Sequence, residues 1–103
     1  MTQGERWWLY VLLCNNDRLY VGIAKDVDAR LQMHRSGRGA IYTRLNPPIR
    51  ILARQPHASK GDALRAEYAL KQLRRPQKLA WIEALAESLR PMPAPPAGDV
   101  TRQ

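Results

Sequence analysis

Five side chains that can handle a phosphate, a proton or a metal ion occur at separate points of this 103-residue chain: Tyr10, Tyr20, Arg30, His34 and Glu67. Arginine carries a permanently charged, planar fork that matches a phosphate edge, and histidine exchanges protons near neutral pH. Glutamate supplies the kind of oxygen ligand that Mg²⁺ prefers. Together these residue types could handle a phosphate, pass a proton and hold a metal ion at one site.

Arg30 and His34 are four residues apart, a spacing that puts both side chains on one face of a helix. Their segment, from Asp26 to Gly37, has helical character because Asp26 can cap it and Val27 and Leu31 recur at helical spacing. From these residues alone, however, the favoured interpretation of Arg30 is a solvated helix charge. That of His34 is a helix-end histidine that the helix dipole stabilises.

Tyr10 and Tyr20 stand in two apolar runs, Trp7 to Cys14 and Arg18 to Ala24, whose polar break predicts a β-hairpin. A phenol, with a pKa of about 10, is a poor base unless nearby positive charge lowers that pKa. Arg30 and a metal ion are candidates for that charge. The alternative is that both rings belong to the core and both hydroxyls lie at its rim.

The remaining segments complete a small α+β fold. We expect a loop over Gly37 to Pro48, a third strand over Ile49 to Ala53, a helix from the Ser59–Asp62 capping box to Arg74, and a last helix over Gln77 to Leu89. The order β-β-α-β-α-α predicts a small three-stranded antiparallel sheet flanked by helices. Residues 1–89 would form one domain, and residues 90–103 a Pro-rich disordered tail.

The charge of the chain predicts a polyanionic partner, with nucleic acid as the first candidate. The formal net charge is +8 and the pI is about 10.4, and no acidic residue occurs between Asp28 and Asp62. The side chains expected to follow phosphates without reading bases are Lys25, Arg35, Arg38, Arg44, Lys60 and Lys71. The alternative is a solvated basic surface that only keeps the protein in solution.

Other features favour a cytoplasmic protein with no membrane partner and no small-molecule cofactor. Cys14 is the single cysteine, so no internal disulfide can form, and we expect it in the core. The longest apolar run, Trp7 to Cys14, is too short to span a bilayer, and its flanks do not fit a signal peptide. His57, expected in a turn with Pro56, is assigned no site.

In this order the residues resemble the GIY-YIG nuclease superfamily, and most of all its small single-domain, YhbQ-like branch. Trp8-Leu9-Tyr10 stands where the first tripeptide of the family would be, without its Gly and Ile, and Tyr20-Val21-Gly22 where the second would be. The segment from Asp26 to His34 is similar to the helix that carries the Arg and His of the family. The segment from Arg65 to Lys71 is similar to its Glu helix, so the resemblance covers about residues 7 to 85.

The resemblance implies a nuclease that depends on Mg²⁺ (or Mn²⁺) and acts on nucleic acid, with DNA favoured, in repair or processing. It implies a preference for nucleic-acid structure or ends over base sequence. By resemblance, Glu67 holds the metal, Tyr20 takes a proton from the attacking water, and Tyr10 orients phosphate or water. Arg30 and His34 complete the catalytic set.

One departure from the family pattern keeps a second function open. The active-site Asn that usually follows the Glu has no match, and Leu79 stands near its place. The chain is therefore alternatively a non-catalytic nucleic-acid-binding module that uses the same basic cleft. Glu67 and Lys71, four residues apart, would equally form an ordinary ion pair. A third possibility is a protein-interaction module whose Pro-rich tail docks on a partner.

Overall fold

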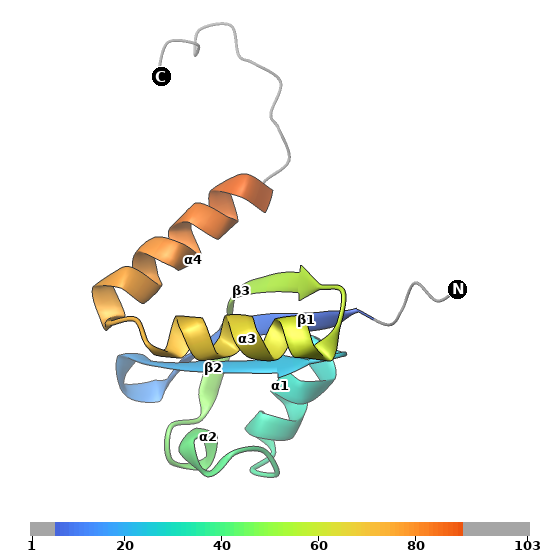
Figure 1. Ribbon diagram of the computed structural model, residues 1–103. Coiled ribbons are helices and arrows are strands. Elements are labelled where there is room, and N and C mark those ends of the chain that lie inside the picture. The colour runs from blue at the N-terminus through green and yellow to red at the C-terminus, as the bar shows by residue number, and fades with distance from the viewer. Residues whose placement is uncertain (1–5, 90–103) are drawn as a thin grey trace, which may run out of the picture.

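The chain folds into a three-stranded sheet with helices on both faces (Figure 1). The computed structural model describes the backbone of residues 6–89 and the side chains of residues 6–85. The elements are β1 (Trp7–Cys14), the short 3-10 helix η2 (Asn15–Asp17), β2 (Arg18–Ala24), α1 (Val27–Arg35), α2 (Ile41–Leu45), β3 (Pro48–His57), α3 (Lys60–Lys71) and α4 (Arg75–Leu89). The interpretation of residues 90–103 as a tail lies outside the described residues.

The sheet is antiparallel with the strand order β2-β1-β3, which confirms the predicted fold class. Strand β1 is central, so successive side chains enter two different parts of the core. Tyr10, Leu12 and Cys14 pack against α1, whereas Leu9 and Val11 pack against the layer of α3 and α4. Because both faces of β1 are covered, its sequence is a continuous apolar run, and its cysteine is buried as expected.

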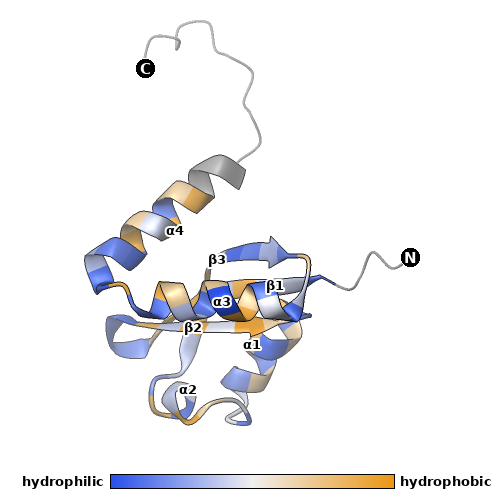
Figure 2. Cartoon of the chain, viewed as in Figure 1, coloured by the Kyte–Doolittle hydropathy of each residue, from blue (hydrophilic) through white to orange (hydrophobic). Residues whose placement is uncertain are grey.

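The hairpin and the starts of α1 and α3 agree with the prediction. Strands β1 and β2 have the predicted bounds. Helix α1 follows the Asp26 cap, whose side chain accepts a hydrogen bond from the Ala29 N–H at 3.0 Å. Helix α3 follows Ser59, whose Oγ accepts from the Asp62 N–H at 3.1 Å. In Figure 2 the colours of α3 and α4 alternate between hydrophobic and hydrophilic, as expected for helices that bury one side.

Helix α3 ends at Lys71 and not at Arg74, and α4 begins at Arg75 and not at Gln77. Two larger differences concern the expected loop and β3. The expected loop from Gly37 to Pro48 contains the five-residue helix α2, whose N-cap residue Ala40 offers no capping side chain. Such a short helix shows neither a cap signal nor a periodicity that sequence reasoning can read. Strand β3 runs on through Pro56 to His57 instead of ending at Ala53, so these two residues are in a strand and not in a turn. Because β3 is an edge strand, it can accommodate a proline that lacks an N–H.

Among the described residues, no helix has both the length and the apolar character that crossing a bilayer requires.

The Ser59 cap provides a test of how α3 is held. Replacing Ser59 by Ala removes the acceptor of the Asp62 N–H, and we expect the free energy of unfolding to fall by about 1 kcal/mol. Ser59→Asp keeps an acceptor at this position and should remain close to the parent protein. Urea-induced unfolding followed by circular dichroism measures both, and equal losses in the two variants would contradict the capping role.

Candidate active site

The buried centre of the site is a hydrogen bond between Tyr10 and His34. Tyr10 Oη lies 3.0 Å from Nε2 of His34, and each residue is 1% exposed. Tyr10 comes from the middle of the central strand, and His34 from the last turn of α1. The hydroxyl of Tyr10 is therefore enclosed together with its ring, whereas the core alternative placed it at the rim.

A glycine makes room for the Tyr10 phenol. Gly22 is paired with Tyr10 across the hairpin, so the two residues share one face of the sheet. A Cβ at position 22 would lie 2.6 Å from Tyr10 Oη and 2.8 Å from its Cζ, far closer than two such atoms approach. The last residue of the Tyr20-Val21-Gly22 tripeptide thus provides the space in which the hydroxyl of Tyr10 meets His34.

The second nitrogen of His34 is held by the turn that follows α1. Nδ1 lies 2.9 Å from Thr43 Oγ1 and 3.4 Å from the Ala40 backbone nitrogen. Gly39 passes over the ring, and a Cβ there would come within 2.0 Å of Nδ1. The Gly37-Arg38-Gly39-Ala40 phrase and the start of α2 together enclose the imidazole.

Tyr20 packs against the same imidazole from β2. The Tyr20 and His34 rings meet edge to face with their centroids 5.0 Å apart, and the Tyr10 centroid is 6.2 Å from that of Tyr20. Tyr20 is half-buried, so its ring forms part of the core while the residue still reaches the surface. Of the two tyrosines, Tyr20 is the one that a solvent-borne substrate can approach.

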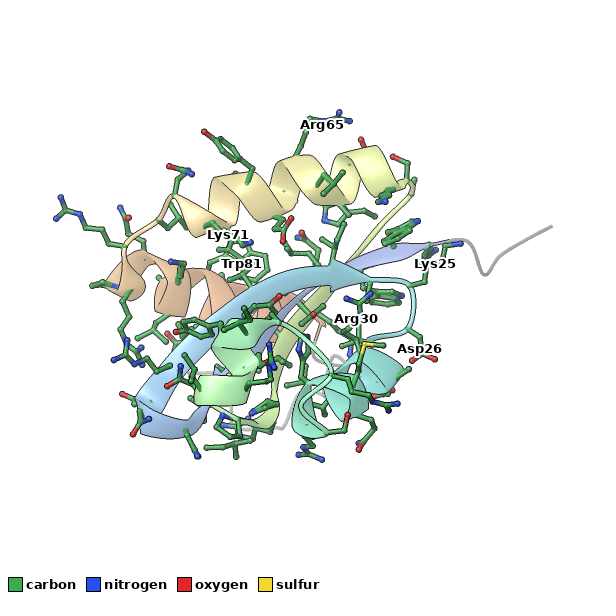
Figure 3. The ribbon with its side chains drawn as sticks, turned by 90° about the horizontal axis from the view of Figure 1, so that it is seen from below. Lys25, Asp26, Arg30, Arg65, Lys71 and Trp81 are labelled. Carbon is green, nitrogen blue, oxygen red and sulfur yellow. The ribbon has the colours of Figure 1, made fainter. Side chains whose placement is uncertain are left out.

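Arg30 and Glu67 lie within electrostatic range of Tyr10. Burial raises the pKa of Tyr10 above its usual value; Tyr20 adds to the rise, Arg30 opposes it, and Glu67 contributes a smaller rise. Arg30 is half-buried on α1, one turn before His34, so the predicted shared helix face is present. Figure 3 shows Arg30 between α1 and the sheet.

The imidazole of His34 is held in its neutral form. Burial, and then the Arg30 charge, lower the pKa of His34 below its ordinary range. A neutral imidazole has one nitrogen that donates and one that accepts. The site thus places a neutral phenol and a neutral imidazole behind the more accessible Tyr20 and Arg30.

Glu67 comes from the opposite face of the sheet. It belongs to α3, and its side chain, 19% exposed, lies 3.1 Å from Lys71 Nζ, so the ion pair expected from the spacing is present. Among the described residues, no three or more His, Cys, Asp or Glu side chains gather around one point. Glu67 is the one carboxylate among the five predicted site residues. That suits Mg²⁺, which keeps several waters and takes further ligands from substrate phosphates.

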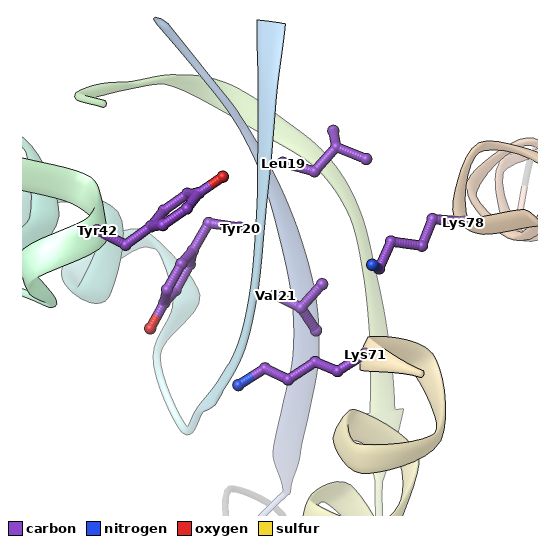
Figure 4. A pocket seen from close by; sticks show the side chains of 6 residues that line it. All are labelled: Leu19, Tyr20, Val21, Tyr42, Lys71 and Lys78. Carbon is purple, nitrogen blue, oxygen red and sulfur yellow. The ribbon is translucent and has the colours of Figure 1, made fainter. Parts of the chain in front are cut away.

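A pocket of about 260 Å³ extends round the edge strand β2 beside Tyr20 (Figure 4). Tyr20 and Tyr42 line it on one side of the strand, with ring centroids 5.9 Å apart. Lys71 and Lys78 line it on the other side, and Lys78 Nζ also donates to the Leu73 carbonyl at 2.9 Å. The pocket thus extends from the tyrosine face, meaning the side of the sheet with Tyr10 and Tyr20, to α3, the helix that carries Glu67.

The other predicted phosphate contacts are distributed around the molecule. Lys25 and Lys60 lie over the ring of Trp7, at 5.6 and 5.2 Å from its centroid. Arg35 donates to the Ile49 carbonyl at 2.7 Å and so connects α1 to β3. Arg38 donates to Ser36 Oγ at 3.0 Å. These residues and Arg44 are all exposed, but only Lys71 of the predicted set lines the pocket beside Tyr20.

Sequence reasoning missed Thr43, Tyr42 and Lys78. Thr43 and Tyr42 belong to α2, which was expected to be a loop, and no motif marks either residue. The sequence offers only an indirect indication of these two residues. They follow the Gly37-Arg38-Gly39-Ala40 segment, within the stretch between Asp28 and Asp62 that has no acidic residue. Lys78 lies in α4, one helix beyond the expected site.

Known proteins with similar sequences indicate the family of the chain. Residues 6–80 match the family described as GIY-YIG catalytic domain. A UPF0213 protein of Xanthomonas axonopodis pv. citri is 49% identical over 84 residues, which is 82% of each chain. One of Cupriavidus pinatubonensis is 39% identical over 87 residues, or 84% of this chain and 97% of that protein. The resemblance inferred from the two tripeptides together with Arg30, His34 and Glu67 is confirmed.

Two solution NMR structures share the fold. The UPF0213 protein from Bacillus halodurans has a TM-score of 0.51 at 38% identity, and the match covers 77% of this chain and 84% of that one. An E. faecalis protein has a TM-score of 0.57 at 34% identity, with 82% and 90% covered.

The contact of Gly39 with the imidazole predicts a specific loss. In Gly39→Ala the new methyl group must displace the His34 ring, so we expect destabilisation of about 1–3 kcal/mol together with loss of the Tyr10 contact. Gly61→Ala is the matched control, because a Cβ there meets nothing closer than 3.7 Å. Urea unfolding and the NMR signals of the His34 ring measure the two effects, and an unchanged His34 environment in Gly39→Ala would refute the packing argument.

The lowered pKa of His34 predicts a pH-dependent stability. The unfolded chain takes up a proton on His34 at about pH 6.5, whereas the folded chain does so only at lower pH. The unfolded state thus binds more protons, and the free energy of unfolding should fall as the pH drops below about 6.5. Urea titrations from pH 7.5 to about 5 measure this slope. His34→Gln should flatten it, and a flat profile for the parent protein would contradict the shift.

Proposed function

The chain belongs to the GIY-YIG family of catalytic domains, and we propose that it is a nuclease that hydrolyses phosphodiester bonds with Mg²⁺ or Mn²⁺ as cofactor. The observation that carries the proposal is the buried Tyr10–His34 hydrogen bond of 3.0 Å, against which the ring of the more accessible Tyr20 packs edge to face. Arg30 lies on the same side of the sheet as these three residues. This combination provides proton handling and fixed positive charge at one place.

Tyr20 is the residue proposed to take the proton of the attacking water. It is half-buried and lines the pocket, whereas Tyr10 is enclosed. The raised pKa of Tyr10 makes its phenol reluctant to ionise, which suits a residue that orients and does not accept a proton. His34 is equally enclosed, so it acts through Tyr10 and Tyr20 and not by direct contact with the substrate.

Arg30 is proposed to stabilise the charge that grows on the phosphate during hydrolysis. Its guanidinium cannot deprotonate and can present two N–H groups to the non-bridging oxygens. A donor of this kind is worth on the order of 10²–10³ in rate. Because Arg30 is half-buried, its field is less screened by water than that of a surface arginine.

GIY-YIG nucleases use divalent metal ions, and Glu67 is the residue proposed to hold one here. When bound, such an ion supplies positive charge to the phosphate oxygens and lowers the pKa of a coordinated water. The carboxylate of Glu67 is largely enclosed by protein, with Lys71 as its partner. Lys71 also lines the pocket, so it can turn to a phosphate of the substrate when Glu67 has another cation.

The proposed substrate is DNA in a cytoplasmic repair or processing reaction, selected by its structure or its ends. The exposed cations, Lys25, Arg35, Arg38, Arg44 and Lys60, suit contacts to the phosphate backbone, which position a nucleic acid without reading its sequence. The net charge of +8 draws such a polyanion to the surface.

Two observations favour the second candidate, a module that binds nucleic acid without cutting it. Glu67 is already neutralised by Lys71 at 3.1 Å. Leu79, which stands near the place of the family's Asn, is 41% exposed on α4 and offers no polar group to a metal or a phosphate. A domain of this kind would hold phosphates in the same pocket with no reaction.

Cleavage assays separate the two candidates. We expect divalent-dependent cleavage within a panel of flaps, forks, single strands and duplexes, with Arg30→Ala and Glu67→Gln each losing on the order of 10²–10³ in rate. Arg65→Ala is the control for Arg30, since Arg65 pairs with Asp62 and points away from the sheet in Figure 3. Glu83→Gln, on the exposed side of α4, is the control for Glu67.

Tight and salt-sensitive binding without products, across the whole panel and with either metal, would replace the nuclease by the binding module. Equal losses in the site variants and in their controls would mean that these positions do not form a catalytic centre.

A further inference from the structure

We propose that Thr43 is a positioning residue that fixes His34 in the tautomer with its hydrogen on Nδ1, and so sets the direction of the Tyr10 hydrogen bond. The fixed tautomer follows from the geometry alone. Its consequence for the reaction rests on the proposed nuclease function. Thr43 is 0% exposed, so no solvent competes for its hydroxyl.

Thr43 connects the Ala40 carbonyl to the imidazole of His34 through two short contacts. Thr43 Oγ1 lies 2.7 Å from the Ala40 carbonyl oxygen and 2.9 Å from His34 Nδ1. The Ala40 carbonyl also accepts from the Thr43 and Arg44 N–H groups, but two oxygens 2.7 Å apart need a hydrogen between them. A carbonyl oxygen only accepts, so this hydrogen is the single hydrogen of the Thr43 hydroxyl. Thr43 Oγ1 can then meet Nδ1 only as an acceptor, which requires that Nδ1 carry the hydrogen of the neutral imidazole.

The other tautomer leaves one short contact without a hydrogen. If Nδ1 had no hydrogen, the Thr43 hydroxyl could donate either to Nδ1 or to the Ala40 carbonyl, but not to both. In the contact left without a hydrogen, two lone pairs would face each other, at 2.9 Å between Oγ1 and Nδ1 or at 2.7 Å between Oγ1 and the carbonyl oxygen. The contact that favours this tautomer is the Ala40 N–H, 3.4 Å from Nδ1. It is the longest contact of the group, and the two shorter ones outweigh it because a hydrogen bond weakens with distance.

With the hydrogen on Nδ1, Nε2 of His34 is a bare acceptor. Tyr10, 3.0 Å from it, must therefore donate its only hydrogen to the imidazole. The free lone pairs of Tyr10 Oη can then only accept. Because phosphate oxygens carry no hydrogen, they cannot donate a hydrogen bond to Tyr10. A water molecule can donate one, so Tyr10 can accept a hydrogen bond from water.

The proposal therefore separates two roles that the sequence left together for Tyr10, orienting phosphate or orienting water. Thr43 and His34 select water. Gly39 supports this arrangement, since a side chain there would push the ring away from Thr43. The half-buried Tyr20 is not bound by this constraint, because its contact with His34 is through the ring.

The tautomer can be measured on the full chain without any substrate or metal. Long-range ¹H–¹⁵N correlation spectra of the uniformly ¹⁵N-labelled protein at pH 7.5 distinguish a hydrogen-bearing ring nitrogen from a bare one. We expect Nδ1 of His34 to bear the hydrogen in the parent protein and in Thr43→Ser. In Thr43→Val, which keeps the shape and loses the hydroxyl, we expect the hydrogen to move in part or fully to Nε2.

A parent spectrum with the hydrogen on Nε2, or an unchanged tautomer in Thr43→Val, would overturn the proposal. The parent spectrum is informative even if the Val variant does not fold. Because no cleavage is involved, this outcome is independent of whether the protein is a nuclease. If it is one, Thr43→Val should lower kcat about five- to ten-fold with little change in KM, and Thr43→Ser should restore it.

Discussion

The hydrogen bond between Tyr10 and His34 is the interaction on which the rest of the site depends. A phenol and an imidazole that are both fully enclosed would each be costly to bury if unpaired, since the interior offers no water to satisfy them. Their bond connects the central strand to α1 over 24 residues of sequence. It also explains the two glycines nearby, because Gly22 leaves space for the phenol and Gly39 leaves space for the imidazole.

This buried pair gives the site two layers. The inner layer, Tyr10, His34 and Thr43, is neutral and is held by short hydrogen bonds. The outer layer, Tyr20, Arg30 and Glu67, is half-buried, and two of its members are charged. A charge in the inner layer would lack solvation, which is why burial moves the pKa of Tyr10 up and that of His34 down. The inner layer can therefore orient, while chemistry that involves charge belongs to the outer one.

The sequence predicts those parts of the fold and the site that depend on residues close together in the chain. It does not predict the parts that depend on tertiary contacts. Local patterns were sufficient for the hairpin and for the helices that begin after Asp26 and Ser59, because alternation and capping act within a few residues. Helix α2 and the continuation of β3 through Pro56 depend on tertiary contacts, and no local pattern marks them. The tripeptides and the spacing of Arg30 and His34 identified the tyrosine face. The burial of His34 and its bond to Thr43 could not be read, because they depend on how the turn at Gly39 folds back.

The charges around Glu67 bear on how a metal could reach the site. Glu67 is the enclosed member of its ion pair, and Lys71 is the exposed one, so a cation approaching from solvent meets the lysine first. The surrounding chain adds a net charge of +8, which lowers the local concentration of free cations and raises that of phosphates. A nucleic acid in the pocket would reverse this balance by offering phosphate oxygens both to Lys71 and to a metal. For the proposed nuclease, metal and nucleic acid would therefore bind more tightly together than either does alone.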